Sequence, residues 1–209
     1  MMIIGVTGGT GCGKTTLLQA VQELGGLVLD CDAIYHDLLK TDKRLLAAIE
    51  SRFPGSVAGG ALDRKKLGGI VFSDPQALDD LNRITHGAVR ERVLQLLENR
   101  PQLAAIDAIG LFEGGLSELC DLTVAVTAPE DARVARLMAR DSISEEYARM
   151  RIAAQPSPEE FARRCDYVLE NNGTASQFRS KCFAFFRELG IIKTESTSTL
   201  IKGDKPHDN

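Results

Sequence analysis

The residue types best suited to chemistry lie near the start of the chain, in the segment TGGTGCGKTT at positions 7–16. Gly8, Gly13, Lys14 and Thr15 have the spacing of a phosphate-binding (Walker A) loop, and the segment lies between a short apolar run and a helical pattern, as such a loop requires. Glycines let backbone N–H groups converge on phosphate oxygens, and a helix N-terminus adds partial positive charge. The segment therefore predicts a site for the phosphates of a nucleotide.

The residues of this loop have distinct predicted roles. The Lys14 ammonium can reach the β- and γ-phosphates, where it would serve binding and catalysis, and the Thr15 hydroxyl is placed to coordinate Mg²⁺. The alternative is a glycine-rich turn that matches the spacing by chance. The predicted nucleotide-binding residues of the loop are Gly9, Thr10, Gly11, Cys12, Gly13, Lys14, Thr15 and Thr16.

Two carboxylates follow the next apolar run. Residues 27–29 predict a buried parallel strand that ends at Asp30 and Asp32. Because the carboxyl ends of parallel strands meet at one edge of a sheet, both side chains should emerge beside the phosphate loop. An aspartate there can deprotonate a hydroxyl that attacks the γ-phosphate, whereas the alternative for either one is to cap the following helix. The two roles can coexist, one per residue.

Three later residues extend this predicted edge. Asp107 lies within a strand predicted over 103–109, at the position of a Walker B carboxylate that reaches the Mg²⁺ shell through water. Glu113 follows, with a substrate or metal role and a solvated loop carboxylate as its two alternatives. The turn after a short fifth strand contains Asn171, which is expected to contact the nucleotide base.

Arginines concentrate in the helical pattern between the last two strands. Phosphoryl transfer needs mobile cations that close over the triphosphate, so this group predicts a lid. For any single arginine the alternative is a solvated helix face with ion pairs, such as Glu145 with Arg149. The arginines are Arg133, Arg136, Arg140, Arg149 and Arg151.

The alternation of short apolar runs with helical patterns predicts an α/β fold of the P-loop NTPase type, a five-stranded parallel sheet flanked by helices. An all-helical stretch, with Asp63 as an N-cap, a helix near 78–81 and a longer one over 84–97, interrupts this alternation and predicts an inserted substrate-binding subdomain. We expect one domain over 1–193, with its core at 1–55, 101–130 and 165–193, the insertion at about 56–100, a lid at about 131–164, and a polar, disordered tail at 194–209.

Composition narrows the classes of partner. The 209 residues carry a net charge of −4 and no long basic run, which argues against nucleic acid and anionic membranes. No signal peptide or transmembrane run is evident, so we expect a cytoplasmic protein. Its five scattered cysteines lack metal-ligand spacing and are expected to stay reduced. Because Cys12 lies in the loop, its alkylation is expected to inhibit. The oligomeric state is left open.

Taken in order, these motifs resemble the dephospho-coenzyme A kinase family over nearly all of the first 190 residues. The resemblance implies ATP-dependent phosphorylation of the 3′-hydroxyl of dephospho-CoA, the last step of CoA synthesis, with ATP, dephospho-CoA and Mg²⁺ as small-molecule partners. The segments that carry it are residues 7–16, Asp30-Cys31-Asp32, Leu62-Asp63-Arg64, Val71-Phe72, Leu81-Asn82-x-Ile84-x-His86, Asp107 with Leu111-Phe112-Glu113, Arg136-Leu137-x-x-Arg140, Arg151-Ile152-x-x-Gln155 and residues 166–173.

By position, the resemblance implies that Asp32 is the base that takes the hydroxyl proton and that Arg140 is the lid arginine. The inserted helices, including Arg64 and His86, would receive the acceptor together with Glu113. For His86 a structural role at a helix start is the alternative.

The sequence departs from the family pattern at two places, and it leaves two alternative functions open. Gly87 stands where family members usually have proline, and Ile109-Gly110-Leu111 stands where they usually have a Pro-Leu-Leu run before Phe-Glu. Both changes are expected to loosen the acceptor-side loops. The alternatives are a kinase of another small hydroxyl substrate such as a nucleoside, and a GTPase-type switch. The switch would use the Asp-x-x-Gly pattern of residues 107–110 and a faint guanine-reading echo at 201–204.

Overall fold

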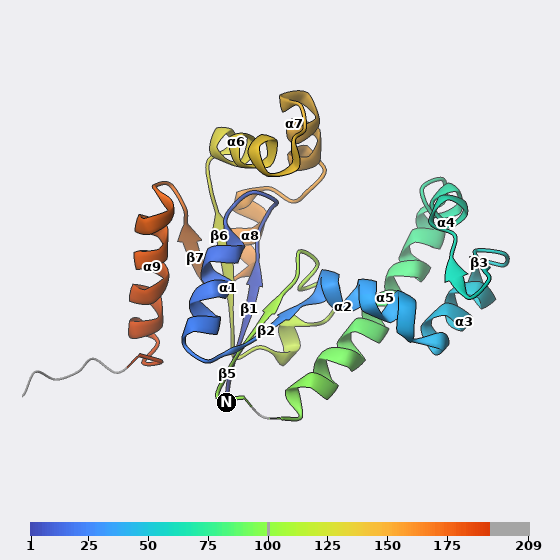
Figure 1. The fold of residues 1–209 in the computed structure, drawn as a ribbon, viewed down its shortest axis with the longest axis horizontal. Helices are drawn as coiled ribbons and strands as arrows, with labels where there is room; N and C mark the ends of the chain where they lie inside the picture. Colours follow the sequence, from blue (N-terminus) through green and yellow to red (C-terminus); the bar gives the residue numbers. More distant parts are fainter. Residues whose placement is uncertain (100, 193–209) are drawn as a thin grey trace, which may run out of the picture.

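The computed structural model describes residues 1–99 and 101–192 (Figure 1). Its main sheet has five parallel strands in the order β2-β5-β1-β6-β7, which confirms the predicted fold class. A central β1 places the loop that follows it between the carboxyl ends of its neighbours. The strands are β1 (Met2–Thr7), β2 (Leu27–Asp30), β5 (Leu103–Asp107), β6 (Leu122–Thr127) and β7 (Tyr167–Glu170).

Both faces of this sheet are buried. Leu103 and Ala105 belong to the cluster formed with α1 (Lys14–Glu23) and α9 (Ala175–Glu188), whereas Ala104 and Ile106 belong to the cluster on the other side. Successive strand residues point to opposite faces, so a strand covered on both sides must be apolar throughout. This is why the strands read as continuous apolar runs.

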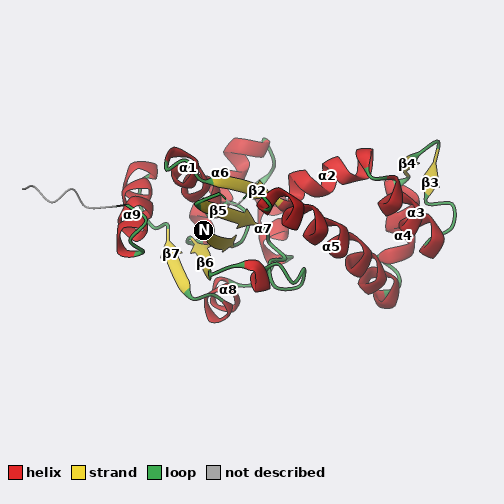
Figure 2. Ribbon diagram, turned by 90° about the horizontal axis from the view of Figure 1, so that it is seen from below, coloured by secondary structure: helices red, strands yellow, loops and turns green. Residues whose placement is uncertain are grey.

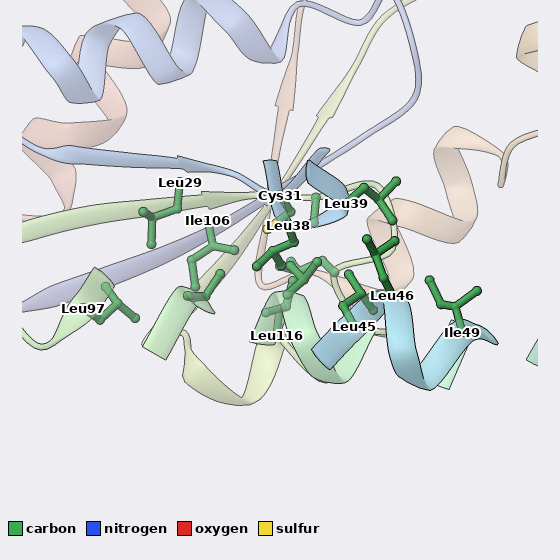
Figure 3. Close-up of a cluster of buried hydrophobic side chains, with 14 of the residues drawn as sticks. Leu29, Cys31, Leu38, Leu39, Leu45, Leu46, Ile49, Leu97, Ile106 and Leu116 are labelled. Atoms are coloured by element: carbon green, nitrogen blue, oxygen red, sulfur yellow. The ribbon is translucent and has the colours of Figure 1, made fainter. Parts of the chain in front are cut away.

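The second cluster joins the sheet to the helices between β2 and β5 (Figure 3). Leu29 and Ile106 from the sheet share it with Leu38, Leu45 and Ile49. The helices between β2 and β5 therefore extend sideways from the sheet edge on a common core, and α5 runs from the sheet to the far end of this helical region (Figure 2). The helices are α2 (Cys31–Thr41), α3 (Lys43–Arg52), α4 (Arg64–Val71) and α5 (Pro75–Leu97).

Aspartates begin all four helices of this region. Asp30, Asp42, Asp63 and Asp74 each accept a hydrogen bond from a backbone N–H in the first turn of the next helix. Such caps are each worth about 1 kcal/mol. The predicted cap at Asp63 is confirmed, and the cap at Asp30 settles which of the two carboxylates after β2 starts α2.

Two local predictions were wrong. The helices predicted near 78–81 and over 84–97 are one continuous helix, α5, because nothing between residues 82 and 84 breaks the helical ladder. The region is also not all-helical. Strands β3 (Val57–Ala58) and β4 (Ala61–Leu62) form a hairpin whose turn residues, Gly59 and Gly60, have φ of 61° and 80°. Two adjacent glycines at positive φ are typical of a two-residue hairpin turn.

The remaining elements follow β5 along the chain. A 3₁₀ helix, η1 (Ser117–Leu119), precedes β6. Helices α6 (Glu130–Asp141) and α7 (Glu145–Ala153) lie above the carboxyl edge of the sheet in Figure 1 and pack on each other through a small cluster of their own. Pro129 is the N-cap residue of α6, without a side-chain cap. Helix α8 (Pro158–Arg164) contacts β6.

Two further findings concern the chain as a whole. Among the described residues no helix is both long and apolar enough to cross a bilayer. The predicted tail at 194–209 and the guanine-reading echo at 201–204 lie outside the described residues.

Candidate active site

The loop between β1 and α1 has the backbone that its glycines allow. Gly8 and Gly13 have φ of 137° and 103°, and a Cβ would overlap the Val126 carbonyl at the first and the Asn171 amide at the second. Gly13 precedes α1 without any side-chain cap. The first N–H groups of α1 therefore face the loop without a side-chain partner, the arrangement that binds anions at helix N-termini.

A hollow of about 410 Å³ opens above this loop. Lys14 lies at its floor, with Nζ donating to the Gly8 carbonyl at 2.9 Å. The hollow brings together residues from the loop, β5, α2 and the α6–α7 hairpin. Its polar and charged lining residues are Thr10, Lys14, Thr15, Asp32, Asp107, Arg136, Arg140, Arg151 and Gln155, with Gly9, Gly11 and Gly13.

Three predicted nucleotide contacts do not line this hollow. Cys12 is buried beneath the loop, and burial raises the pKa of its thiol. Asn171 is also buried and donates through Nδ2 to the Cys12 carbonyl at 2.9 Å. Its amide therefore holds the backbone of the loop, and the predicted contact with the nucleotide base stays a prediction. Thr16 is half-buried and outside the lining.

The two carboxylates after β2 have separate positions. Asp30 Oδ1 accepts from the Ala33 N–H at 3.0 Å, so this carboxylate is the helix cap. Asp32 lies in the first turn of α2 and is free of that task. It lines the hollow above the loop and also a second hollow of about 260 Å³. Asp32 thus lies at the boundary between two spaces that could each hold a ligand.

Asp107 lies between these groups at the end of β5, directly opposite Asp30 in the parallel pairing. Its Oδ1 is buried and has no hydrogen-bond partner among the described residues. Burial raises its pKa to about 6; Lys14 opposes this shift, and Asp30 and Asp32 add to it. A buried carboxylate oxygen without a partner costs free energy unless a cation or ordered water satisfies it.

These oxygens fit Mg²⁺, which binds through one or two protein oxygens, phosphates and several waters. The Thr15 hydroxyl and Asp107 supply oxygens of that kind on one side of the hollow. No group of three or more His, Cys, Asp or Glu side chains able to hold a metal occurs in the described part of the chain. A cation here would therefore depend on phosphate oxygens for its remaining ligands.

The base of the α6–α7 hairpin is bonded to the loop. Arg133, which is only 4% exposed, donates through Nε to the Thr10 carbonyl at 2.9 Å. Arg136 Nη1 donates to the carbonyls of Gly11 at 3.1 Å and Cys12 at 3.3 Å. Gln155 Oε1 accepts from the Thr10 N–H at 2.7 Å. Sequence reasoning assigned no role to Gln155, although its segment contributed to the resemblance.

The other arginines of the hairpin fall into two groups. Arg140 and Arg151 line the hollow and share Asp141, at 2.7 Å and 2.5 Å, and they hold the pKa of that carboxyl below its usual range. Arg149 instead pairs with Glu145, Glu130 and Asp131 at 2.9, 2.6 and 3.0 Å. The solvated ion-pair alternative is therefore confirmed for Arg149.

The second hollow lies between α2, α5 and the loop after β5. His86 lines it together with Asp32, Asn82 and Ile109. Glu113 is ion-paired with Arg164 and lies outside this lining, beside a shallower depression that His86 also borders. Arg64 lies farther out, with Nη2 3.1 Å from His36 Nδ1. Of the predicted acceptor residues, the structure brings Asp32 and His86 together and places Glu113 and Arg64 around them.

Gly87 does not lie in a loop. It is an interior residue of α5, and a Cβ there would meet open space. The expectation that Gly87 loosens an acceptor-side loop is therefore wrong, because the residue is held in a helical ladder.

Comparisons with known proteins identify the family of this chain. The model of the family described as dephospho-CoA kinase matches residues 2–177. The dephospho-CoA kinase of Syntrophotalea carbinolica is 37% identical over 195 residues, covering 90% of this chain and 92% of the relative. The solved structure of TT1252 from Thermus thermophilus has a TM-score of 0.74 at 35% identity, covering 90% of this chain and 97% of that one. A dephospho-CoA kinase from Campylobacter jejuni has a TM-score of 0.63 at 29% identity, with 90% and 96% covered. This chain belongs to the dephospho-CoA kinase family.

Proposed function

We propose that this protein transfers the γ-phosphoryl group of ATP to the 3′-hydroxyl of dephospho-CoA and so forms CoA. The observation that carries the proposal is the position of Asp32, which borders both the hollow above the phosphate loop and the hollow between α2 and α5. A phosphotransferase needs its base where donor and acceptor meet, and family membership names the acceptor.

On the donor side, the loop N–H groups and the N-terminus of α1 bind the phosphates. Lys14 exchanges its contact with the Gly8 carbonyl for the β- and γ-phosphates. Arg136, Arg140 and Arg151 face the same hollow and neutralise the negative charge that spreads over the γ-phosphoryl oxygens in the transition state.

On the acceptor side, Asp32 orients the hydroxyl and takes its proton. The hydroxyl oxygen forms a bond to the γ-phosphorus as the bond to the β–γ bridging oxygen breaks, and ADP leaves. Asp32 is exposed, so an acceptor hydroxyl that enters the hollow can reach its carboxylate.

Thr15 and Asp107 are the residues that would hold Mg²⁺, Thr15 directly and Asp107 through water. When bound, the ion neutralises phosphate charge and orients the γ-phosphoryl group. We place the reaction in the cytoplasm as a proposal, since all five cysteines are unpaired thiols, as a reducing compartment favours.

A coupled ADP-release assay with ATP and Mg²⁺ tests the proposal against its alternatives. We expect turnover with dephospho-CoA and none with uridine or cytidine. Turnover only with a nucleoside would favour a nucleoside kinase. Tight GTP binding with slow hydrolysis and no acceptor turnover would favour a switch. Product analysis by mass spectrometry and ³¹P NMR would locate the new phosphate on the 3′-oxygen.

A further inference from the structure

An apolar groove on α4 continues the acceptor hollow outward. This groove, of about 170 Å³, shares Tyr35 and Leu81 with the hollow that contains Asp32. Leu62, Leu67, Val71 and Phe72 supply the rest of its apolar wall. The site described above uses none of these four side chains.

Phe72 is exposed to an unusual degree. Its side chain is 86% exposed, more than any other large hydrophobic residue of the described chain, whereas Leu67 and Val71 beside it are 4% exposed. The ring lies along Gly68, where an added Cβ would come within 3.3 Å of Cε2. An exposed aromatic ring beside a preformed apolar groove costs solvation free energy, which a ligand that covers it would recover.

Arg64 brings positive charge close to Tyr35, a residue that the groove shares with the hollow. Arg64 lines the groove together with Tyr35, and its guanidinium lies 3.1 Å from the ring of His36, the residue after Tyr35. The guanidinium can only donate, so His36 Nδ1 accepts in this contact, and Arg64 is the positively charged group beside the junction of hollow and groove. Arginine binds phosphate oxygens through its planar fork of N–H donors.

The order of these surfaces matches the order of groups in dephospho-CoA. From Asp32 outward lie a hollow of nucleoside size, then Arg64, then an apolar groove. The acceptor carries its 3′-hydroxyl on an adenosine, then a 5′-diphosphate, then the long, weakly polar pantetheine arm. Resting on the proposed function, we propose that the groove binds the pantetheine arm of the acceptor, with the Phe72 ring packing against it.

The test compares Phe72→Ala with wild type in steady-state kinetics. Covering one aromatic ring is worth enough free energy that the KM for dephospho-CoA should rise about tenfold. The kcat and the KM for ATP should stay unchanged, because Phe72 touches neither phosphates nor the reacting hydroxyl. Leu94→Ala is the matched control: Leu94 is an apolar residue of α5, 43% exposed, that lines none of the described hollows, and its removal should leave every constant unchanged.

A truncated ligand separates the groove from the rest of the site. Adenosine 5′-monophosphate lacks the arm, so its inhibition constant against dephospho-CoA should be the same in Phe72→Ala as in wild type. An equal rise for both ligands would show a disturbed pocket and overturn the proposal. An unchanged KM for dephospho-CoA would also overturn the proposal. If the KM is unchanged and the variant loses self-association in sedimentation, Phe72 is part of an interface between copies of the protein.

Failure of the proposed function itself has a different signature. In that case wild-type protein would not phosphorylate dephospho-CoA at all. Titration calorimetry of dephospho-CoA, with a non-hydrolysable ATP analogue filling the donor site, still tests the groove without turnover. About tenfold weaker binding by Phe72→Ala would support the groove, and equal binding would overturn it.

Discussion

Asp32 and Asp30 differ in what they contact, although they are two residues apart. Asp32→Asn removes the base but keeps the size of the side chain, so we expect kcat to fall by about two orders of magnitude or more while the KM for ATP changes little. Asp30→Asn is the matched control, because asparagine caps a helix as well as aspartate does, and its kcat should stay near that of wild type. Steady-state kinetics with both variants decides the assignment. Near-normal turnover of Asp32→Asn would remove Asp32 from the base role.

The reactivity of Cys12 provides a second prediction for a single residue. The thiolate is the reactive form, and burial raises the Cys12 pKa, so near pH 7 the thiol is almost wholly protonated as well as shielded. We therefore expect iodoacetamide to label the partly exposed Cys165 before Cys12, and labelling of Cys12 to accelerate as the pH rises. Peptide mass spectrometry over time measures both. Fast inactivation at pH 7 that Cys12→Ser abolishes would contradict this and support the inhibition expected from the sequence.

The contacts that sequence reasoning missed at this scale are long-range ones. Spacing along the chain predicted the loop and the carboxylate at Asp32, because each depends on residues close in sequence. Gln155 and Arg133 contact Thr10 across separations of 145 and 123 residues. No local pattern encodes such a pairing. For the same reason the sequence predicted that Asn171 is near the nucleotide site but not that its amide donates to the Cys12 carbonyl.

At the scale of elements, local signals predicted strands and helix caps well, but they predicted poorly how far a helix extends. Two helices were predicted near 78–81 and over 84–97, but α5 begins at Pro75 and has no stop signal until residue 97. The hairpin of β3 and β4 was missed because each strand has only two residues, too few for alternation to be visible.

Glycines in two elements make a matched stability test. Gly87→Ala and Gly60→Ala both place a methyl group in open space. Gly87 is in the interior of α5, where alanine is favoured over glycine by about 0.5–1 kcal/mol. The melting temperature of the Gly87→Ala variant should therefore be about 2 °C above that of the wild type. Gly60 has φ of 80°, a conformation that alanine adopts only with strain, so Gly60→Ala should lower the melting temperature. Thermal unfolding followed by circular dichroism measures both. A lower melting temperature for Gly87→Ala would mean that α5 is strained at this position.

For the molecule as a whole, the strand order joins distant parts of the chain into one site. β1 pairs with β5 and β6, so the loop after β1 lies beside Asp107 and close to α2. The sequence predicted that these carboxyl ends share an edge, since parallel sheets require it, but the order of the strands depends on packing that no single segment specifies.

Two hollows that meet at Asp32 predict that donor and acceptor bind together. A ligand at 100 times its Kd stabilises the folded state by about 2.7 kcal/mol, so a Mg²⁺-bound non-hydrolysable ATP analogue and dephospho-CoA at such concentrations should together contribute about 5 kcal/mol. If both competed for one hollow, the combined effect would scarcely exceed that of either alone, because occupancy of one site is already complete. Chemical unfolding with each ligand, and with both, distinguishes these cases. A non-additive result would place both substrates in one hollow and remove Asp32 from the boundary between them.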